Sequence, residues 1–267
     1  MTATMRSLSR RLVPAPARAR LRRWWYTVRP PRVKVGVGAG LRFDPGPSNP
    51  AYARGDNETP VQAALAEHVR PGSVVVDIGA NVGFFTVLAA RLVGPEGRVI
   101  AFEPVPTNAR YVRRNAALNG FHQVTVIERA VADRGGTAEL VLAAYAGGAA
   151  LRSAGPPPDA TTSIVVDVTT LDEAVARGEI PPPDVVKIDV EGAEAAVLRG
   201  MAETMRTHRP VIICEVDDGD PTRFDEKHQT CAAIVEAAGY DIVPLERSYH
   251  GGSWIVGHFV GIPRPAA

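Results

Sequence analysis

From residue 73 onward, short apolar runs alternate with segments whose apolar residues recur at helical spacing. The runs, rich in β-branched residues, predict strands at 73–78, 98–102, 124–128, 185–188, 211–215, 241–245 and 254–262. The segments between them predict helices at 83–92, 107–119, 171–177, 191–205 and 225–238. Continuously apolar strands that alternate with helices indicate a largely parallel sheet covered on both faces. The closing strand is expected to run antiparallel.

Residues 139–142 and 163–168 predict paired edge strands around a loop at 145–160 that is rich in Gly, Ala and Pro. Before residue 73, alternating valines at 33–37, a glycine turn and residues 41–43 predict a small hairpin, and 59–69 predicts a helix. A helical stripe of apolar residues precedes the hairpin and consists of Leu21, Trp24, Trp25 and Val28. Pro30 ends this helix.

We therefore divide the chain into three parts. Residues 1–31 form a basic, partly helical arm, residues 32–72 a hairpin, loop and helix, and residues 73–267 the α/β domain. The chain contains 30 basic and 29 acidic residues, but ten basic residues and no acidic ones fall in 1–34. The rest carries 20 basic against 29 acidic residues, a balance of −9. A basic arm is thus attached to an acidic body.

The arm leaves three interpretations open: a handle for nucleic-acid phosphates, a peripheral contact with a membrane or protein, or packing onto its own domain. The acidic body lacks a basic face, which disfavours nucleic acid as the substrate. No apolar run is long enough to span a bilayer or to form a secretion signal. The two cysteines, Cys214 and Cys231, lack metal-ligand spacing, so we expect buried thiols in a cytoplasmic protein.

The string VVVDIGANVGFFT at 74–86 carries the strongest chemical signal. Asp77 ends a buried strand, and Gly79, Asn81 and Gly83 form a tight turn into a helix. The spacing is not the G-x-G-x-x-G of dinucleotide sites, and an acid beside the turn would repel a pyrophosphate. An acid suits a ligand that carries an ammonium group and no phosphate. S-adenosylmethionine is such a ligand, so these residues are predicted to bind it.

The end of the second strand predicts the ribose site. Glu103, in the string AFEP, is placed to accept hydrogen bonds from both ribose hydroxyls. Pro104 and Asn108 follow it and are assigned to the same site. At the end of the third strand, backbone groups around Ala130 are expected to contact adenine.

The string DVVKIDVEGAE at 184–194 predicts the reacting edge of the crevice. Asp189 ends a strand, where it is expected to orient the methyl donor or to accept a proton from a hydroxyl. Glu191 and His250 are the further candidates for the base, whereas His258, inside the closing strand, is interpreted as structural. In-line transfer from a sulfonium carbon requires no metal, so no metal site is predicted.

Taken together, these motifs resemble the FkbM methyltransferases over about residues 52–262. The D-x-G-A-N-x-G-x-x-T, FEP, A-V-x-D and K-I-D-V-E-G-A-E strings carry the resemblance. It implies a class I Rossmann-like fold, S-adenosylmethionine as cofactor, and O-methylation of a small hydroxylated acceptor, either a natural product or a sugar. The segment at 54–58 is similar to a family segment before the first strand, which implies that Glu58 reaches the amino-acid end of the donor. A nucleic-acid methyltransferase and a cofactor-binding interaction scaffold remain the alternatives.

Overall fold

In the computed structural model, residues 29–46, 48–143, 149–151, 160–249 and 254–265 are described. The tryptophan stripe of the arm and His250 lie outside this part of the chain. Among the described residues, none of the helices combines the length and the apolar character that a bilayer crossing requires.

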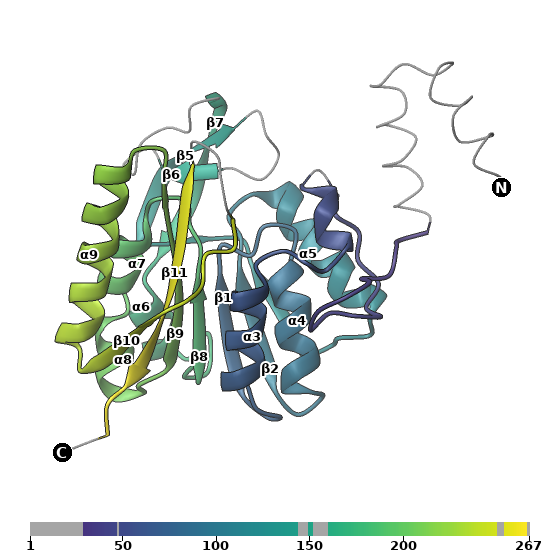
Figure 1. The fold of residues 1–267 in the computed structure, drawn as a ribbon, viewed down its shortest axis with the longest axis horizontal. Helices are drawn as coiled ribbons and strands as arrows, with labels where there is room; N and C mark the ends of the chain where they lie inside the picture. The colour runs from purple at the N-terminus through teal and green to yellow at the C-terminus, as the bar shows by residue number, and fades with distance from the viewer. Residues whose placement is uncertain (1–28, 47, 144–148, 152–159, 250–253, 266–267) are drawn as a thin grey trace.

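A seven-stranded sheet organises the molecule (Figure 1). Its strand order is β10-β11-β9-β8-β1-β2-β3, and all neighbours are parallel except that β11 runs antiparallel to β9 and β10. The strands are β1 (Val74–Ile78), β2 (Arg98–Phe102), β3 (Val124–Ile127), β8 (Val185–Ile188), β9 (Val211–Asp218), β10 (Tyr240–Pro244) and β11 (Ile255–Pro263). The order of connection reverses between β1 and β8, and open α/β sheets bind ligands at such a point, beyond the carboxyl ends of the strands.

Helices cover both faces of this sheet, as the sequence predicts for buried parallel strands. One face is covered by α3 (Thr59–His68), α4 (Phe84–Val93) and α5 (Pro106–Leu118). The other face is covered by α6 (Leu171–Ala176), α7 (Glu194–Arg199), α8 (Ala202–Thr207) and α9 (Pro221–Ala237). This three-layer arrangement, with a mostly parallel sheet and an antiparallel β11, is a Rossmann-like α/β fold, so the predicted fold class is confirmed.

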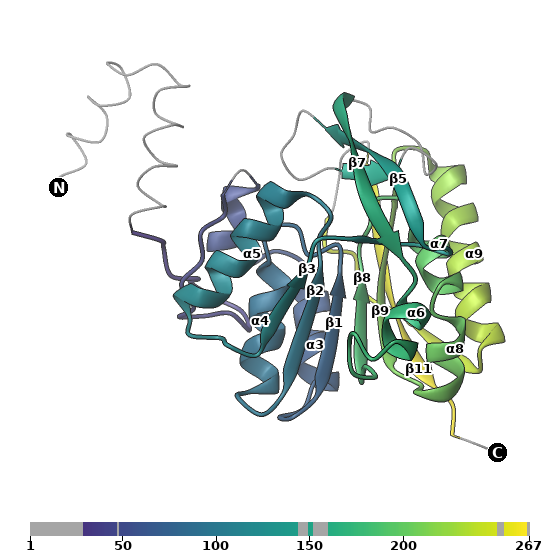
Figure 2. The same ribbon diagram turned by 180° about the vertical axis from the view of Figure 1, so that it is seen from behind.

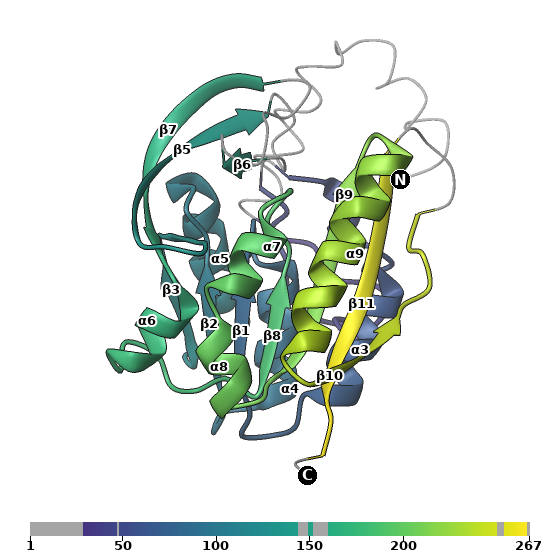
Figure 3. The same ribbon diagram turned by 90° about the vertical axis from the view of Figure 1, so that its left-hand side faces the viewer.

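A second, four-stranded sheet has the order β4-β7-β5-β6. Its strands are β4 (Ala130–Val131), β5 (Gly136–Ala143), β6 (Ala149–Leu151) and β7 (Ala160–Thr169). The antiparallel pair β5 and β7 confirms the predicted pairing of 139–142 with 163–168. Figures 2 and 3 show this pair above the edge of the main sheet at which β1 and β8 end. The second sheet therefore stands beside the ligand-binding edge.

The predicted helix at 191–205 is wrong in extent. The structure has two short helices instead, α7 and α8, separated at Gly200–Met201. The first begins only at Glu194 because Glu191 and Gly192 have φ angles of +53° and +101°, which a right-handed helix does not allow. Gly200 has no room for a side chain, since a Cβ there would lie 2.0 Å from the carbonyl oxygen of Ala132.

The predicted hairpin at 33–43 is reduced to one antiparallel bridge, between Arg32 and Arg42. The backbone amides of Lys34 and Val35 donate to the carbonyl oxygen of Arg54 rather than to a partner strand. Arg54 follows a short 3-10 helix, Pro50–Ala53, so the segment is tied to the loop that leads into α3. The predicted hairpin is thus confirmed in part. The amide of Val33 donates to Leu41, and the amides of Gly40 and Phe43 donate to Val33 and Pro31, but the valines beyond Val33 do not join a partner strand.

Candidate active site at the carboxyl ends of β1, β2, β8 and β9

The turn after β1 is shaped by two glycines that lie close to other backbone. Gly79 has a φ of +83°, and a Cβ there would lie 1.7 Å from the carbonyl oxygen of Asp189. Gly83 has a φ of +86°, and a Cβ there would lie 3.0 Å from the Cα of Val112. Both positions demand the left-handed region and open space, which only glycine offers without strain. The turn thus joins the end of β1 to the end of β8.

Asp77 and Glu103 lie buried at the ends of β1 and β2, as predicted. Asp77 accepts a hydrogen bond from the hydroxyl of Thr86 at 2.6 Å, and its other oxygen has no partner among the described residues. Burial raises the pKa of Asp77, whereas the nearby ammonium of Lys187 lowers it. Glu103 accepts hydrogen bonds from the backbone amides of Asn81 at 2.7 Å and Val105 at 2.9 Å. Burial nevertheless raises the pKa of Glu103 to about 8.

The remaining residues of the predicted donor site surround Glu103. Asn81 has a φ of +51° and belongs to the turn whose amide Glu103 binds. Asn108 lies 3.5 Å from the same carboxylate, measured from its side-chain nitrogen, and Pro104 directly follows Glu103. Ala130 is buried in β4, where it pairs with Val168 of β7. The contact of Ala130 with adenine stays a prediction.

Asp189 follows β8 at the point where the strand order reverses. Its carboxylate lies 2.9 Å from the ammonium of Lys187, whose side chain is 3% exposed against 25% for Asp189. Lys187 also lies over the ring of Phe85, 4.6 Å from its centroid. Burial alone would lower the pKa of Lys187, but Asp189 and the other nearby carboxylates raise it above its usual range. Lys187 is therefore a buried, permanently charged partner that holds Asp189 in place.

An acidic rim lies beside Asp189. Burial, together with the charges of Asp217 and Asp189, raises the pKa of Glu191 to about 9. Glu194 accepts a hydrogen bond from the amide of Gly192, yet its burial raises its pKa to about 7. Glu191 therefore holds its proton more tightly than an ordinary carboxyl group does, and it shares a side-chain hydrogen bond with Asp217.

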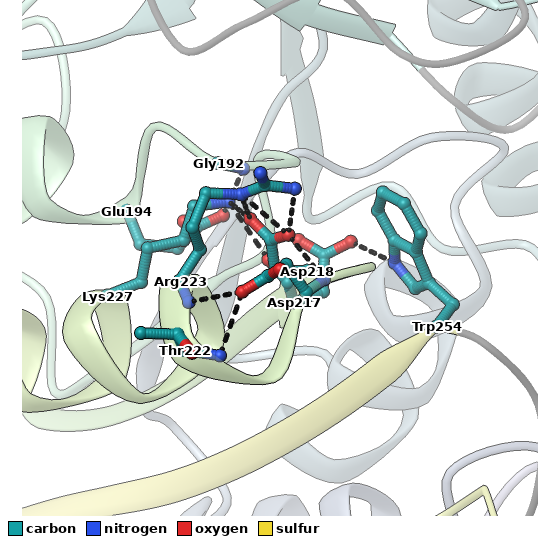
Figure 4. A network of polar contacts seen from close by, with 9 residues as sticks. Gly192, Glu194, Asp217, Asp218, Thr222, Arg223, Lys227 and Trp254 are labelled. Atoms are coloured by element: carbon teal, nitrogen blue, oxygen red, sulfur yellow. Dashed lines mark hydrogen bonds and ion pairs between the residues drawn. The ribbon is translucent and has the colours of Figure 1, made fainter.

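Figure 4 shows how the far side of this rim is held. Trp254 donates its indole N–H to Asp217 at 2.6 Å. The adjacent Asp218 pairs with Arg223 and Lys227 of α9, each at 2.9 Å, and these contacts lower the pKa of Asp218 although burial opposes them. Asp218 is thus a structural anchor, whereas Asp217 and the indole border the crevice.

The sequence analysis named Glu58 as a donor-site residue but missed the group of polar residues to which it belongs. His258 lies in β11, as expected, but its Nε2 lies 2.6 Å from Oε2 of Glu215 in β9. Glu58 joins them, with Oε2 4.0 Å from the same nitrogen. Burial lowers the pKa of His258 to about 4 and raises the pKa values of both glutamates. The only sequence signal was the polar residue in each of two apolar strands, Glu215 and His258.

Gln62 fixes the loop that positions Glu58 beside Glu215 and His258. Its side-chain amide donates to the carbonyl oxygens of Gly55 at 2.9 Å and Asn57 at 2.6 Å, and its oxygen accepts from the amide of Val37. These contacts fix the loop before α3. Glu58 then caps the helix with a φ of +45°, a backbone region that few non-glycine residues adopt.

Comparison with known proteins shows to which family this chain belongs. Residues 77–242 match the profile of the methyltransferase FkbM domain. The chain belongs to the FkbM methyltransferase family. Its relatives include the 31-O-demethyl-FK506 methyltransferase FkbM of Streptomyces tacrolimicus, which is 32% identical over 74% of this chain and 83% of the relative. The hexuronic acid methyltransferase AglP of Haloferax volcanii is 27% identical over 77% of this chain and 86% of the relative.

Among solved structures, cofactor-bound Rv0187 from MTB is similar with a TM-score of 0.49 and 19% identity, and the match covers 97% of this chain and 95% of that one. As a member of the FkbM family, the chain is a methyltransferase that uses S-adenosylmethionine. The site fits this cofactor. Asp77 offers a buried oxygen without a described partner, Glu103 lies at the end of β2, and the glycines keep the turn clear of side chains.

Proposed function

We propose that this methyltransferase acts on a hydroxyl oxygen of a natural product or a sugar. Asp189 carries the proposal, because its backbone packs against the glycine turn and its carboxylate is partly exposed at the point where the strand order reverses. A carboxylate at this place is able to accept the proton of a hydroxyl that approaches the donor. The names of the relatives FkbM and AglP, one with an O-methyl site and one with a hexuronic acid, support an oxygen acceptor.

The bound cofactor supplies an activated methyl group on a sulfonium, with a neutral thioether as leaving group. The residues of this chain then have three tasks. Asp77 and Glu103 bind and orient the donor, Asp189 accepts the acceptor proton, and Lys187 holds Asp189 in position. Glu191, whose pKa is raised by burial and which shares a side-chain hydrogen bond with Asp217, lies beside Asp189 and contributes to the charge of this edge.

The acceptor side of the crevice suits a polyhydroxylated molecule. Tyr249 and Trp254 are both 45% exposed, and Trp254 is bound to the buried Asp217. Aromatic rings beside carboxylates offer an apolar face for ring carbons and acceptors for hydroxyl groups. The predicted peripheral contact of the arm is independent of this proposal, and it stays a prediction.

The proposal is tested by incubating the purified protein with S-adenosylmethionine and two acceptor panels, hydroxylated macrolides and hexuronic acids. Amine acceptors of matched size serve as the comparison. We expect a product that gains one methyl group on oxygen, located by carbon NMR, and S-adenosylhomocysteine in equal amount. Methylation of amines but not hydroxyls would contradict the oxygen assignment while leaving the methyltransferase itself intact.

A further inference from the structure

Three side chains that could ligate a metal meet between α3 and the sheet. Glu58 caps α3, Glu215 lies in β9 and His258 lies in β11. Glu215 and His258 are direct partners in the β9–β11 register, so both side chains point to the same face of the sheet. The helix α3 packs on β9 and brings Glu58 to this face. One ligand atom of each residue lies within 4.8 Å of the other two.

Glu58 is aimed into this cluster. Its Oε1 accepts a hydrogen bond from the hydroxyl of Tyr249 at 2.8 Å, which fixes the orientation of the carboxylate. Its Oε2 then faces His258 at 4.0 Å, and no described residue donates a hydrogen bond to it, although the side chain is only 7% exposed. A buried carboxylate oxygen without a partner is costly, so this atom indicates a ligand.

The charges around the cluster point to a cation. Asp77 and Asp189 lie close enough to Lys187 to act on it electrostatically, as do Glu58 and Glu215. Lys187 makes its direct ion pair with Asp189, 2.9 Å away. Four buried or partly buried carboxylates therefore share one lysine, and the two glutamates have no direct ion pair with it among the described residues. Buried carboxylates in such excess are typically neutralised by protons or by a metal ion.

We propose that Glu58, Glu215 and His258 bind a divalent transition-metal ion of the manganese class. One imidazole with two carboxylates suits Mn²⁺, Fe²⁺ or Zn²⁺ better than Ca²⁺ or Mg²⁺, which prefer oxygen ligands alone. Ligand bonds of about 2.0–2.2 Å place the ion between the three side chains after small side-chain rotations. Three protein ligands would leave coordination positions open for water or a further ligand.

This assignment does not depend on the proposed acceptor, because the ion is measured without donor or acceptor. It also gives Glu58 a role other than contact with the amino-acid end of the donor. The test begins with protein that has been treated with a chelator and dialysed. MnCl₂ is titrated into it by calorimetry, and free Mn²⁺ is followed by its paramagnetic resonance signal.

Three variants sharpen the measurement. Glu58→Gln and Glu215→Gln keep the side-chain volume but remove the charged ligand oxygen. Glu67→Gln removes an exposed acid from the same helix as Glu58 and serves as the matched control. We expect one saturable site in the parent chain and in Glu67→Gln, and at least about tenfold weaker binding in each of the other two, which corresponds to about 1.4 kcal/mol. Circular dichroism confirms that each variant is folded.

No saturable binding by the folded parent chain would overturn the proposal. So would binding that is unchanged in both Glu58→Gln and Glu215→Gln, because the ion would then lie elsewhere. A failure of the methyltransferase assignment gives a different result from a failure of the metal proposal: S-adenosylhomocysteine does not bind, whereas Mn²⁺ still does.

Discussion

The two halves of the crevice hold their acidic residues in different ways. In the half formed by β1 and β2, each buried acid has a hydrogen-bond donor nearby: Thr86 for Asp77, and two backbone amides for Glu103. In the half formed by β8, β9 and β11, Glu58 and Asp217 also have donors, Tyr249 and Trp254, but acids here lie close to other acids as well. Glu191 lies close to Asp217, and Glu58 to Glu215. Lys187 acts electrostatically on Glu58 and Glu215 from within the sheet, and Lys227 of α9 acts on Asp217.

This difference suits the first half to binding a cofactor in one geometry, and the second half to changes of protonation and charge during the reaction. Carboxylates that are bound by backbone amides keep one geometry, which suits a cofactor that is the same in every turnover. Carboxylates that repel one another exchange protons or cations easily, which suits proton transfer and a varied acceptor. Substitutions that change side-chain size should therefore affect the first half most, and substitutions or pH changes that alter charge should affect the second half most.

The largest effect is expected from Gly79→Ala. Its Cβ would overlap the carbonyl oxygen of Asp189, and the φ of +83° adds strain, so we expect a loss of stability of more than about 3 kcal/mol and no measurable binding of S-adenosylhomocysteine. Thermal unfolding and calorimetry check this. Gly72→Ala is the matched control, because Gly72 has a similar φ of +87° but nothing within 4 Å of a Cβ. Equal losses in both variants would show that the close approach to β8 is unimportant.

Asp189→Asn should lower turnover by about 100-fold or more, because the group that accepts the proton is lost. The affinity for S-adenosylhomocysteine should change by less than about threefold, since a change at the reacting edge acts on the transition state rather than on donor binding. Steady-state rates and calorimetry separate the two effects. Glu191→Gln is the comparison, and we expect a smaller loss because the glutamine still donates a hydrogen bond. A larger loss of turnover in Glu191→Gln than in Asp189→Asn would indicate that Glu191, and not Asp189, accepts the proton.

A change of pH should affect the second half through stability. The folded state raises the pKa of Glu191 to about 9 and that of Glu194 to about 7, so both groups bind protons more strongly when folded. Their stabilising contribution is present below the ordinary pKa near 4.5 and is lost as the pH rises toward 9. We expect the unfolding temperature to fall over this interval. Glu191→Gln should flatten the slope, and a parallel pH profile in that variant would contradict the assigned pKa.

The smallest effect is expected from Trp254→Phe. The substitution removes the N–H that binds Asp217 and keeps an aromatic ring at the border of the crevice. We expect the KM for the acceptor to rise by about threefold to tenfold, because one hydrogen bond to a charged group is lost at a half-exposed site. Initial rates at saturating donor measure this change. A change of donor affinity instead would place Trp254 in the first half.

The sequence predicted the first half well, and for a physical reason. The turn after β1 needs glycines at fixed spacing, and the positions of Asp77 and Glu103 after two apolar strands follow from the strand pattern, so both leave local motifs; that Glu103 binds the ribose stays a prediction. The order of strands and helices from residue 73 was likewise readable from apolar periodicity. The errors, at 191–205 and at 33–43, came from left-handed backbone and from long-range contacts with Arg54 and Gln62.

Only part of the second half could be predicted in this way: the string at 184–194 placed Asp189 and Glu191, whereas a second cluster left no shared motif. Glu58, Glu215 and His258 stand far apart in the chain, and only the packing of α3 on β9 and the register of β11 bring them together. Within each local pattern they resemble an ordinary helix cap and two polar interruptions of strands. Their raised or lowered pKa values depend on burial that no local motif records.

The most direct test of the central claim is calorimetric titration of S-adenosylhomocysteine into the parent chain and into Glu103→Ala, with NAD as the control ligand. We predict saturable binding of S-adenosylhomocysteine alone, and about tenfold weaker binding in Glu103→Ala, because the variant loses the hydrogen bonds to the ribose hydroxyls, each of which contributes about 0.5–1.5 kcal/mol. Equal affinity in the two proteins would show that the donor does not lie at the ends of β1 and β2.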